Sequence, residues 1–152
     1  RVHDALLAAG ATGKVRVLDD SARTAAEAAA ALGVEIGQIT NSLVFTADAE
    51  PLLVLTSGRH RVDTAKVAAL FGISKVGRAD ADFVREHTGV AIGGVSPVGH
   101  PHPIRTLVDT ALRDYDVVWA AAGNPHAVFP TTFDELVRIT AGTAADVGVD
   151  TK

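Results

Sequence analysis

Residues 40–56 read TNSLVFTADAEPLLVLT and hold two short apolar runs on either side of a polar stretch. The runs, at residues 40–46 and 52–56, have the length and the β-branched and aromatic content that are typical of strands. The five residues between them are enough for a tight connection. We therefore expect an antiparallel hairpin, with Pro51 at the edge of its second strand because proline cannot donate a ladder hydrogen bond.

Helix signals surround this hairpin. Residues 24–33, 63–72, 80–89 and 132–141 each begin with Thr or Asp, whose side chains cap free backbone N–H groups. In the first and last of these segments a Glu follows the Thr by three residues, which completes a capping box. The first three segments end in Gly, a residue that tolerates the left-handed conformation of a helix terminus. We therefore predict a helix over each segment.

The remaining elements are less regular. Further strands are expected at residues 14–18, 104–109, 117–121 and 127–130, a short helix at residues 2–9, and a tail at residues 144–152. Strands and helices do not alternate regularly, and the hairpin requires antiparallel pairing. These features predict an α+β (mixed α/β) fold, a curved, barrel-like mixed sheet with surrounding helices, built as a single domain over residues 1–152.

Composition limits the chemistry. The chain has 152 residues, a formal net charge of −4 and no Cys, so disulfides, thiolate nucleophiles and Cys-based zinc or iron–sulfur sites are excluded. An acidic protein does not coat nucleic acid, because such binding neutralises many phosphates with Lys and Arg. We expect no DNA partner, although a local basic pocket for one RNA end remains compatible with the charge.

Hydropathy argues against a membrane protein. No run approaches the roughly 18 apolar residues that cross a bilayer, and the start of the chain does not resemble a signal peptide. We therefore expect a cytoplasmic protein with no membrane partner. The oligomeric state cannot be read from the sequence.

The most loop-like segment, residues 93–103, reads GGVSPVGHPHP. Glycines allow backbone N–H groups to approach a ligand, and prolines stiffen the loop, so the segment could present amides to a carbonyl or phosphate oxygen. It could equally be an ordinary connection. Ser96 lacks the G-x-S-x-G context of a hydrolase nucleophile, so we expect its hydroxyl to form a hydrogen bond within the loop.

Histidines and basic residues give two further candidates. His100, His102 and His126 could bind zinc, but the proline between the first two restricts their geometry, and we expect no metal and no cofactor. Positive charge gathers between Arg59 and Arg78, which could hold a phosphate locally or form a solvated helix face.

Several motifs, taken in order, resemble a known family. They are TAAEAAAALG at residues 24–33, QITNSLVF at 38–45, VDTAK at 62–66, GGVSP at 93–97, AGNPHAVFP at 122–130, and Glu135-Leu136. Together they resemble the YbaK family, whose domain is also found inserted in bacterial prolyl-tRNA synthetases. The resemblance covers about residues 20–142.

The resemblance implies an activity. Members of this family are trans-editing aminoacyl-tRNA deacylases, hydrolases that protect translation fidelity by cleaving the ester of a mischarged tRNA. The family loop G-x-x-x-P falls on residues 93–97, where Gly93, Gly94 and Ser96 would line the catalytic site beside Val95 and Pro97. The expected partner is the aminoacyl-adenosine at the tRNA acceptor end.

The resemblance also suggests residues around this loop. On position alone, Arg59, Arg61 and Lys66 are candidates for nearby phosphates. His100 and His126 would lie at the rim of the substrate site.

One position departs from the family pattern. Asn41 stands where the family commonly carries a lysine that is important for deacylation, and Asn can donate a hydrogen bond but carries no charge. Asn41 could still orient the substrate while facing the loop from the hairpin, or a cation such as Lys66 could replace the charge. Alternatively, the domain is a non-catalytic binding module for an aminoacyl or nucleotide ligand.

Overall fold

The hairpin expected at residues 40–56 is the centre of the structure, a computed structural model that describes residues 10, 13–18, 25–73, 76–90, 95–102, 104–122 and 127–150. Strands β2 (Ile39–Ala47) and β3 (Glu50–Ser57) pair antiparallel, from Thr40 opposite Ser57 to Ala47 opposite Glu50. The turn residues Asp48 and Ala49 have φ values of 52° and 69°. Both angles suit the tight turns that match the twist of a two-stranded ribbon. The hairpin is confirmed.

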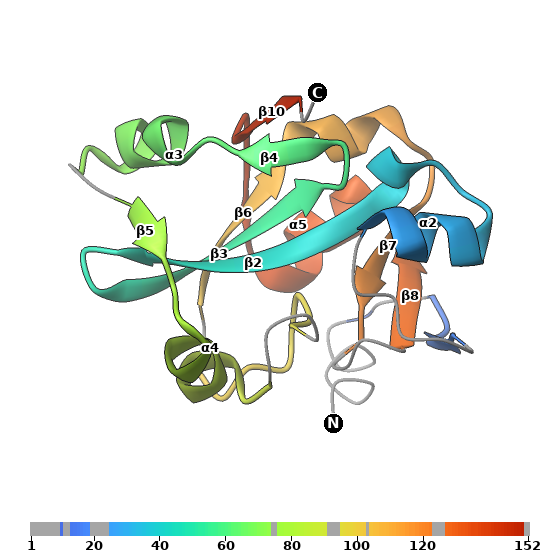
Figure 1. The fold of residues 1–152 in the computed structure, drawn as a ribbon, viewed down its shortest axis with the longest axis horizontal. Helices are drawn as coiled ribbons and strands as arrows, with labels where there is room; N and C mark the ends of the chain where they lie inside the picture. Colours follow the sequence, from blue (N-terminus) through green and yellow to red (C-terminus); the bar gives the residue numbers. More distant parts are fainter. Residues whose placement is uncertain are drawn as a thin grey trace.

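Parallel and antiparallel strands extend the hairpin into a mixed sheet of order β1-β8-β7-β2-β3-β6-β9 (Figure 1). Strand β7 pairs parallel with β2, and β6 pairs parallel with β3. Strand β8 pairs antiparallel with β7, and β5 pairs antiparallel with β2. A second, two-stranded sheet joins β4 and β10. The bounds of these strands are β1 (Arg16–Val17), β4 (His60–Val62), β5 (Val76–Arg78), β6 (Arg105–Asp109), β7 (Val118–Ala121), β8 (Ala127–Thr131), β9 (Thr143–Ala145) and β10 (Gly148–Asp150).

Helices begin and end where the sequence signals them. The helices are α2 (Ala25–Leu32), α3 (Thr64–Phe71), α4 (Ala81–Thr88) and α5 (Phe133–Thr140), with short 3-10 turns η1 (Ile36–Gln38) and η2 (Thr110–Asp114). Asp63, Asp80 and Thr132 accept backbone N–H groups of α3, α4 and α5 as caps. The expected helix at residues 2–9 and the cap at Thr24 lie outside the described residues.

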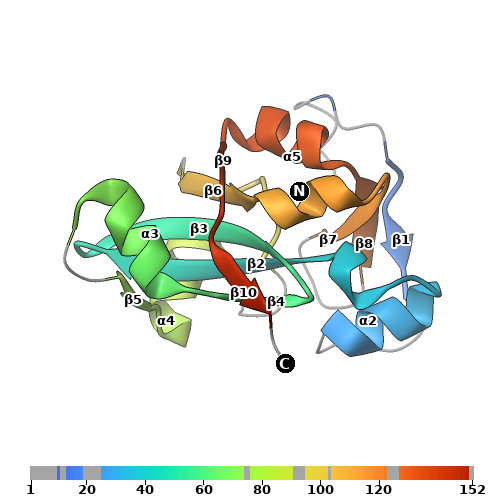
Figure 2. The ribbon, with the colours of Figure 1, turned by 90° about the horizontal axis from the view of Figure 1, so that it is seen from above.

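Side chains that alternate along the hairpin fill two cores. Val44, Leu53 and Leu55 point to one face of the sheet and pack with buried residues of α4, η2 and α5. Phe45 and Val54 point to the other face, which α3 covers. Helix α2 lies at the end of the sheet near β7 and β8, whereas α3 and α4 lie at the other end beside β5 (Figures 1 and 2). The mixed α/β architecture expected from the sequence is confirmed.

The expectation of a tail at residues 144–152 is wrong for the residues that the structure describes. Strand β9 pairs with β6, and β10 pairs with β4. Val147, between the two strands, is fully buried in the core beneath α3. Short strands that mix Ala, Gly and Asp carry little apolar alternation, so the pattern gave no signal for them. Within the described residues, no helix combines the length and the hydrophobicity needed to cross a bilayer.

The end of α5 yields a prediction about stability. Ala141 closes this helix with a φ of 52°, a conformation in which an alanine Cβ is strained and a glycine is not. We expect Ala141→Gly to raise the free energy of unfolding by about 0.5–1 kcal/mol, measured by urea denaturation. Ala30→Gly, at an exposed position inside α2, is the matched control and should lower it by about 1 kcal/mol. A loss of stability in Ala141→Gly would contradict the prediction.

Candidate functional site

The segment at residues 95–102, called here the proline loop, carries the described part of the G-x-x-x-P motif. Val95, Ser96 and Pro97 are buried, and Ser96 is only 2% exposed. The Ser96 hydroxyl accepts a hydrogen bond from the Val98 N–H at 3.3 Å, as expected for a serine that shapes its own loop. Gly93 and Gly94 lie outside the described residues.

His100 holds the proline loop together. Its Nε2 lies 2.7 Å from the carbonyl oxygen of Ser96. Burial lowers the pKa of His100, although the hydrogen bond to Ser96 partly opposes this. The ring is therefore neutral near pH 7, and Nε2 carries the proton that is donated to Ser96. This contact closes a turn across four residues and fixes the direction of the loop.

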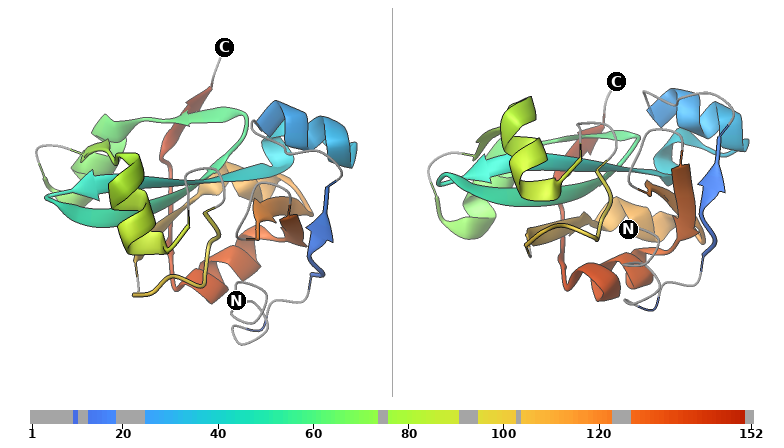
Figure 3. Two further views of the ribbon diagram at one scale, coloured as in Figure 1. Left: turned by 60° about the horizontal axis from the view of Figure 1, so that its bottom comes forward. Right: turned by 90° about the horizontal axis from the view of Figure 1, so that it is seen from below.

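The proline loop lies across one face of β2. Val95 belongs to the core cluster that contains Val44, and Val98 packs against the cluster of Ala120 and Phe129. Ala120 is in turn the register partner of Thr40. Because side chains of a strand alternate, Thr40, Ser42 and Val44 share this face. Figure 3 shows the loop, in yellow, crossing beneath β2 between α4 and the β7–β8 pair.

Asn41 lies on the other face of β2. It is half-buried and stands opposite Thr56 in β3. The structure thus differs from the expectation that Asn41 faces the loop, because the alternation that turns Val44 toward Val95 turns Ser42, and not Asn41, in the same direction. The edge of β2 beside Asn41 has no partner strand among the described residues. Among the described strands, β7 pairs with β2 only to Thr40 and β5 pairs with it only from Phe45, which leaves this edge open at residues 41–44.

Arg59 and Lys66 are held by acidic partners away from the proline loop. Arg59 donates to Asp114 Oδ2 at 2.8 Å and to the Tyr115 hydroxyl at 3.0 Å. The hydrogen bond to Asp114 raises the pKa of Arg59.

Lys66 Nζ lies 3.4 Å from Asp146 and donates to the Gly148 carbonyl at 3.0 Å. Among the described residues, these contacts hold the Lys66 ammonium group at Asp146 and Gly148, and Lys66 forms no hydrogen bond with Asn41.

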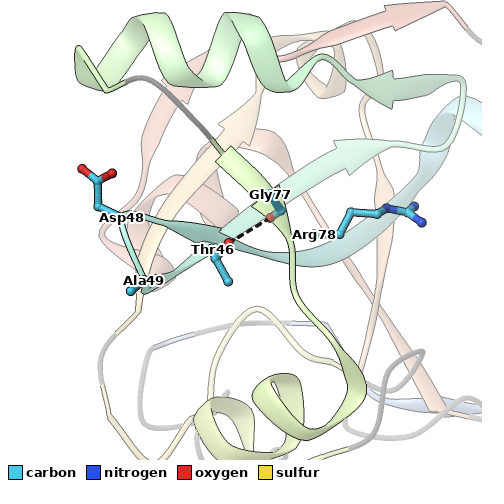
Figure 4. Close-up of a pocket in the computed structure, with 5 residues that line it drawn as sticks. All are labelled: Thr46, Asp48, Ala49, Gly77 and Arg78. Carbon is cyan, nitrogen blue, oxygen red and sulfur yellow. Dashed lines mark hydrogen bonds between the residues drawn. The ribbon is translucent and has the colours of Figure 1, made fainter.

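Arg78, unlike Arg59 and Lys66, has no acidic partner among the described residues. It lines an open pocket of about 500 Å³ with Thr46, Asp48, Ala49 and Gly77, beside the hairpin turn. Figure 4 shows its side chain extending along β2, away from Asp48. Among the described residues it has no carboxylate partner within ion-pair distance.

The histidines do not assemble a metal site in the part of the chain that the structure describes. No group of three His, Asp or Glu residues there could hold a metal ion. His102 is exposed, and His126 lies outside the described residues.

Two features of the site were not predicted from the sequence. The first is a pair of buried hydroxyls without a hydrogen-bond partner in the described structure, on Thr40 and Ser42, which share the face of β2 that carries Val44. Their only signal was the polar stretch TNS inside an apolar strand.

The second feature is Asp109, which is fully buried at the end of β6. Its Oδ2 accepts the Ser57 N–H at 3.1 Å and lies 2.8 Å from His60 Nδ1. Asp109 thereby ties β3, β4 and β6 together.

The chain belongs to the aminoacyl-tRNA editing domain family, whose model matches residues 19–139. The uncharacterized protein YwhH of Bacillus subtilis is 30% identical over 123 residues, which are 80% of this chain and 78% of that protein. A proline–tRNA ligase of Nitratidesulfovibrio vulgaris is 32% identical over 103 residues, or 68% of this chain. The match spans only 18% of that ligase.

A solved structure supports the same relationship. It is described as a proposed trans-editing enzyme for prolyl-tRNA synthetase, and it shares 44% identity with a TM-score of 0.92. The alignment covers 97% of this chain and 94% of that one. The resemblance inferred from the ordered motifs is confirmed.

His100 generates a prediction about pH. Because its pKa is lowered in the folded state, the unfolded chain binds a proton more readily, and stability is lost as pH falls below about 6.5. His100→Gln keeps an N–H donor but does not titrate. We expect the wild-type melting temperature to fall more steeply than that of His100→Gln between pH 7.5 and 5.5. Parallel curves for the two proteins would contradict this.

Proposed function

We propose that this protein is a trans-editing deacylase that hydrolyses the ester between a wrongly attached amino acid and the terminal adenosine of tRNA. The observation that carries the proposal is the proline loop, buried and held by His100, against a polar stretch of β2 in a member of the editing family. A rigid loop of this kind suits a reaction that depends on positioning.

The proposed hydrolysis would need no nucleophilic side chain. An aminoacyl ester is already activated, so a positioned water can attack its carbonyl carbon. Backbone N–H groups of residues 93–96 would stabilise the oxygen that gains charge, as in an oxyanion hole. The bond to the ribose oxygen then breaks, the ribose oxygen takes a proton from the water, and the products are a free amino acid and uncharged tRNA.

The charge distribution is compatible with an RNA end. Arg59 and Lys66 already contact acidic groups, so phosphate binding by either would replace an existing contact. Arg61 and Arg78 are exposed and lack a carboxylate partner among the described residues. Few phosphates would therefore be bound, and the salt dependence of binding should be shallow.

A binding module is the second candidate, because Asn41 stands at the position of the family lysine without its charge. Such a protein would hold an aminoacyl or nucleotide ligand without hydrolysing it. The two candidates differ in what a restored charge should do.

Deacylation of a panel of mischarged tRNAs tests the proposal. We expect the wild type to hydrolyse at least one member well above the rate in buffer, and Asn41→Lys to lower that rate if Asn41 belongs to a working site. Glu86→Gln, on the exposed face of α4, is the control that should leave the rate unchanged. If the wild type is inactive and Asn41→Lys gains activity, the binding module replaces the deacylase.

A further inference from the structure

The edge of β2 that pairs with β5 carries three accessible side chains of different chemistry. Asn41 is half-buried, Leu43 is 37% exposed, and Arg78, at the end of β5, is exposed. Between β5 and β7 this edge has no partner strand at residues 41–44 in the described part of the chain. An exposed leucine beside unpaired strand backbone is a surface that a ligand could complete.

The three side chains lie in a row on one face of the sheet. Arg78 is the register partner of Phe45, and cross-strand partners point to the same face. Asn41, Leu43 and Phe45 share that face because side chains alternate along a strand. The Cα atoms of Asn41 and Phe45 are about 14 Å apart along β2. Figure 4 shows the Arg78 side chain extending along β2 away from the hairpin turn, and thus toward the open stretch.

The charge of Arg78 is available to a ligand. Two carboxylates are close in sequence or in the hairpin turn, but both are occupied or directed elsewhere. Asp80 accepts the Phe83 N–H at 2.8 Å as the cap of α4, and Asp48 lies on the side of the turn from which Arg78 extends away (Figure 4). Within the described residues, Arg78 forms no ion pair. Its guanidinium therefore remains a full positive charge at the open edge.

A nucleotide has the chemistry that this row could accept. The planar guanidinium of Arg78 matches the oxygens of a phosphate in a two-pronged hydrogen bond. Leu43 offers an apolar surface to a base or a sugar, and the Asn41 amide can both donate and accept. The amino group of an attached amino acid is itself a cation and would be repelled by Arg78. The phosphate is the anionic group that an RNA end supplies.

We propose that Arg78 binds the phosphate that precedes the terminal adenosine and thereby orients the RNA end along the open edge of β2. This inference rests on the proposed function, which supplies the RNA as substrate. Arg78 then touches the substrate but takes no part in breaking the ester bond. Its loss should weaken binding and leave the chemical step unchanged.

A cycle of paired changes in protein and RNA tests the contact. The probe is an RNA hairpin without an amino acid, with the acceptor stem of a proline tRNA and a CCA end, chosen for the similarity to proline–tRNA ligases. A second hairpin carries a neutral methylphosphonate in place of the last phosphodiester. We expect Arg78→Gln to lower the affinity for the first hairpin about tenfold.

The second hairpin shows whether that loss belongs to one phosphate. Wild-type protein should bind it about tenfold more weakly than the first, whereas Arg78→Gln should bind the two hairpins equally, because the contact is already lost. The salt dependence of binding should also become shallower in Arg78→Gln, by about 0.7 in the slope of log affinity against log salt. Arg78→Lys keeps the charge but not the planar fork, so its affinity should be intermediate.

Arg113→Gln is the matched control, because it removes the same charge from an exposed side chain elsewhere. Arg113 lies in η2, which follows β6, on the side of β3 away from β2 and β5. Its replacement should change the affinity less than twofold and keep the preference for the phosphodiester. Arg78→Gln should keep the wild-type melting temperature, because its side chain makes no hydrogen bond within the described structure.

Distinct results would overturn distinct claims. If Arg78→Gln weakens both hairpins equally or neither of them, the phosphate contact is wrong and the deacylase is unaffected. An equal loss in Arg113→Gln would also overturn the contact, since net charge would then explain the effect. In deacylation, the contact requires kcat/KM to fall in Arg78→Gln while kcat is kept, and an unchanged kcat/KM would contradict it. If no mischarged tRNA is hydrolysed but the cycle behaves as expected, the deacylase fails and the phosphate site stands.

Discussion

The register between β2 and β3 is the constraint on which the rest of the molecule depends. Residues 52–55 of β3 are at most 1% exposed, since β2 and β6 flank the strand and helices cover both of its faces. A slip of one residue would turn every side chain of β2 to the wrong core. The same register decides which polar residues of β2 share a face with Val44, whose core cluster includes Val95 of the proline loop, so the hydrophobic packing of β3 also affects the candidate site.

Local chemistry made much of the fold predictable. Asp63 and Asp80 cap their helices as expected because capping depends on neighbouring residues alone. The strands at residues 143–150 were missed, since they exist only because β6 and β4 offer unpaired edges. The candidate site divides in the same way. The loop motif was readable, whereas the face on which Asn41 lies depends on alternation relative to Val44, which only the packed sheet reveals.

Two buried polar groups show how differently the fold treats polarity. Asp109 is fully buried, but Ser57, Ala111 and His60 surround its carboxylate with partners, so it joins strands and stabilises them. Thr40 is also buried, yet its hydroxyl has no partner in the described structure. A satisfied polar group stabilises the architecture, whereas an unsatisfied buried hydroxyl costs stability.

The non-local strand pairings have a consequence for how the chain folds. The β2–β3 hairpin closes over a two-residue turn. In contrast, β4 pairs with β10 and β6 pairs with β9, and both partner strands lie far along the chain. Contacts between distant segments slow folding because long loops must close first. Until residues 143–150 dock, the edge of β6 and the apolar surface around Val147 stay open. Refolding intermediates that expose such an edge and core are prone to aggregate, which makes dilute refolding the favourable condition for this domain.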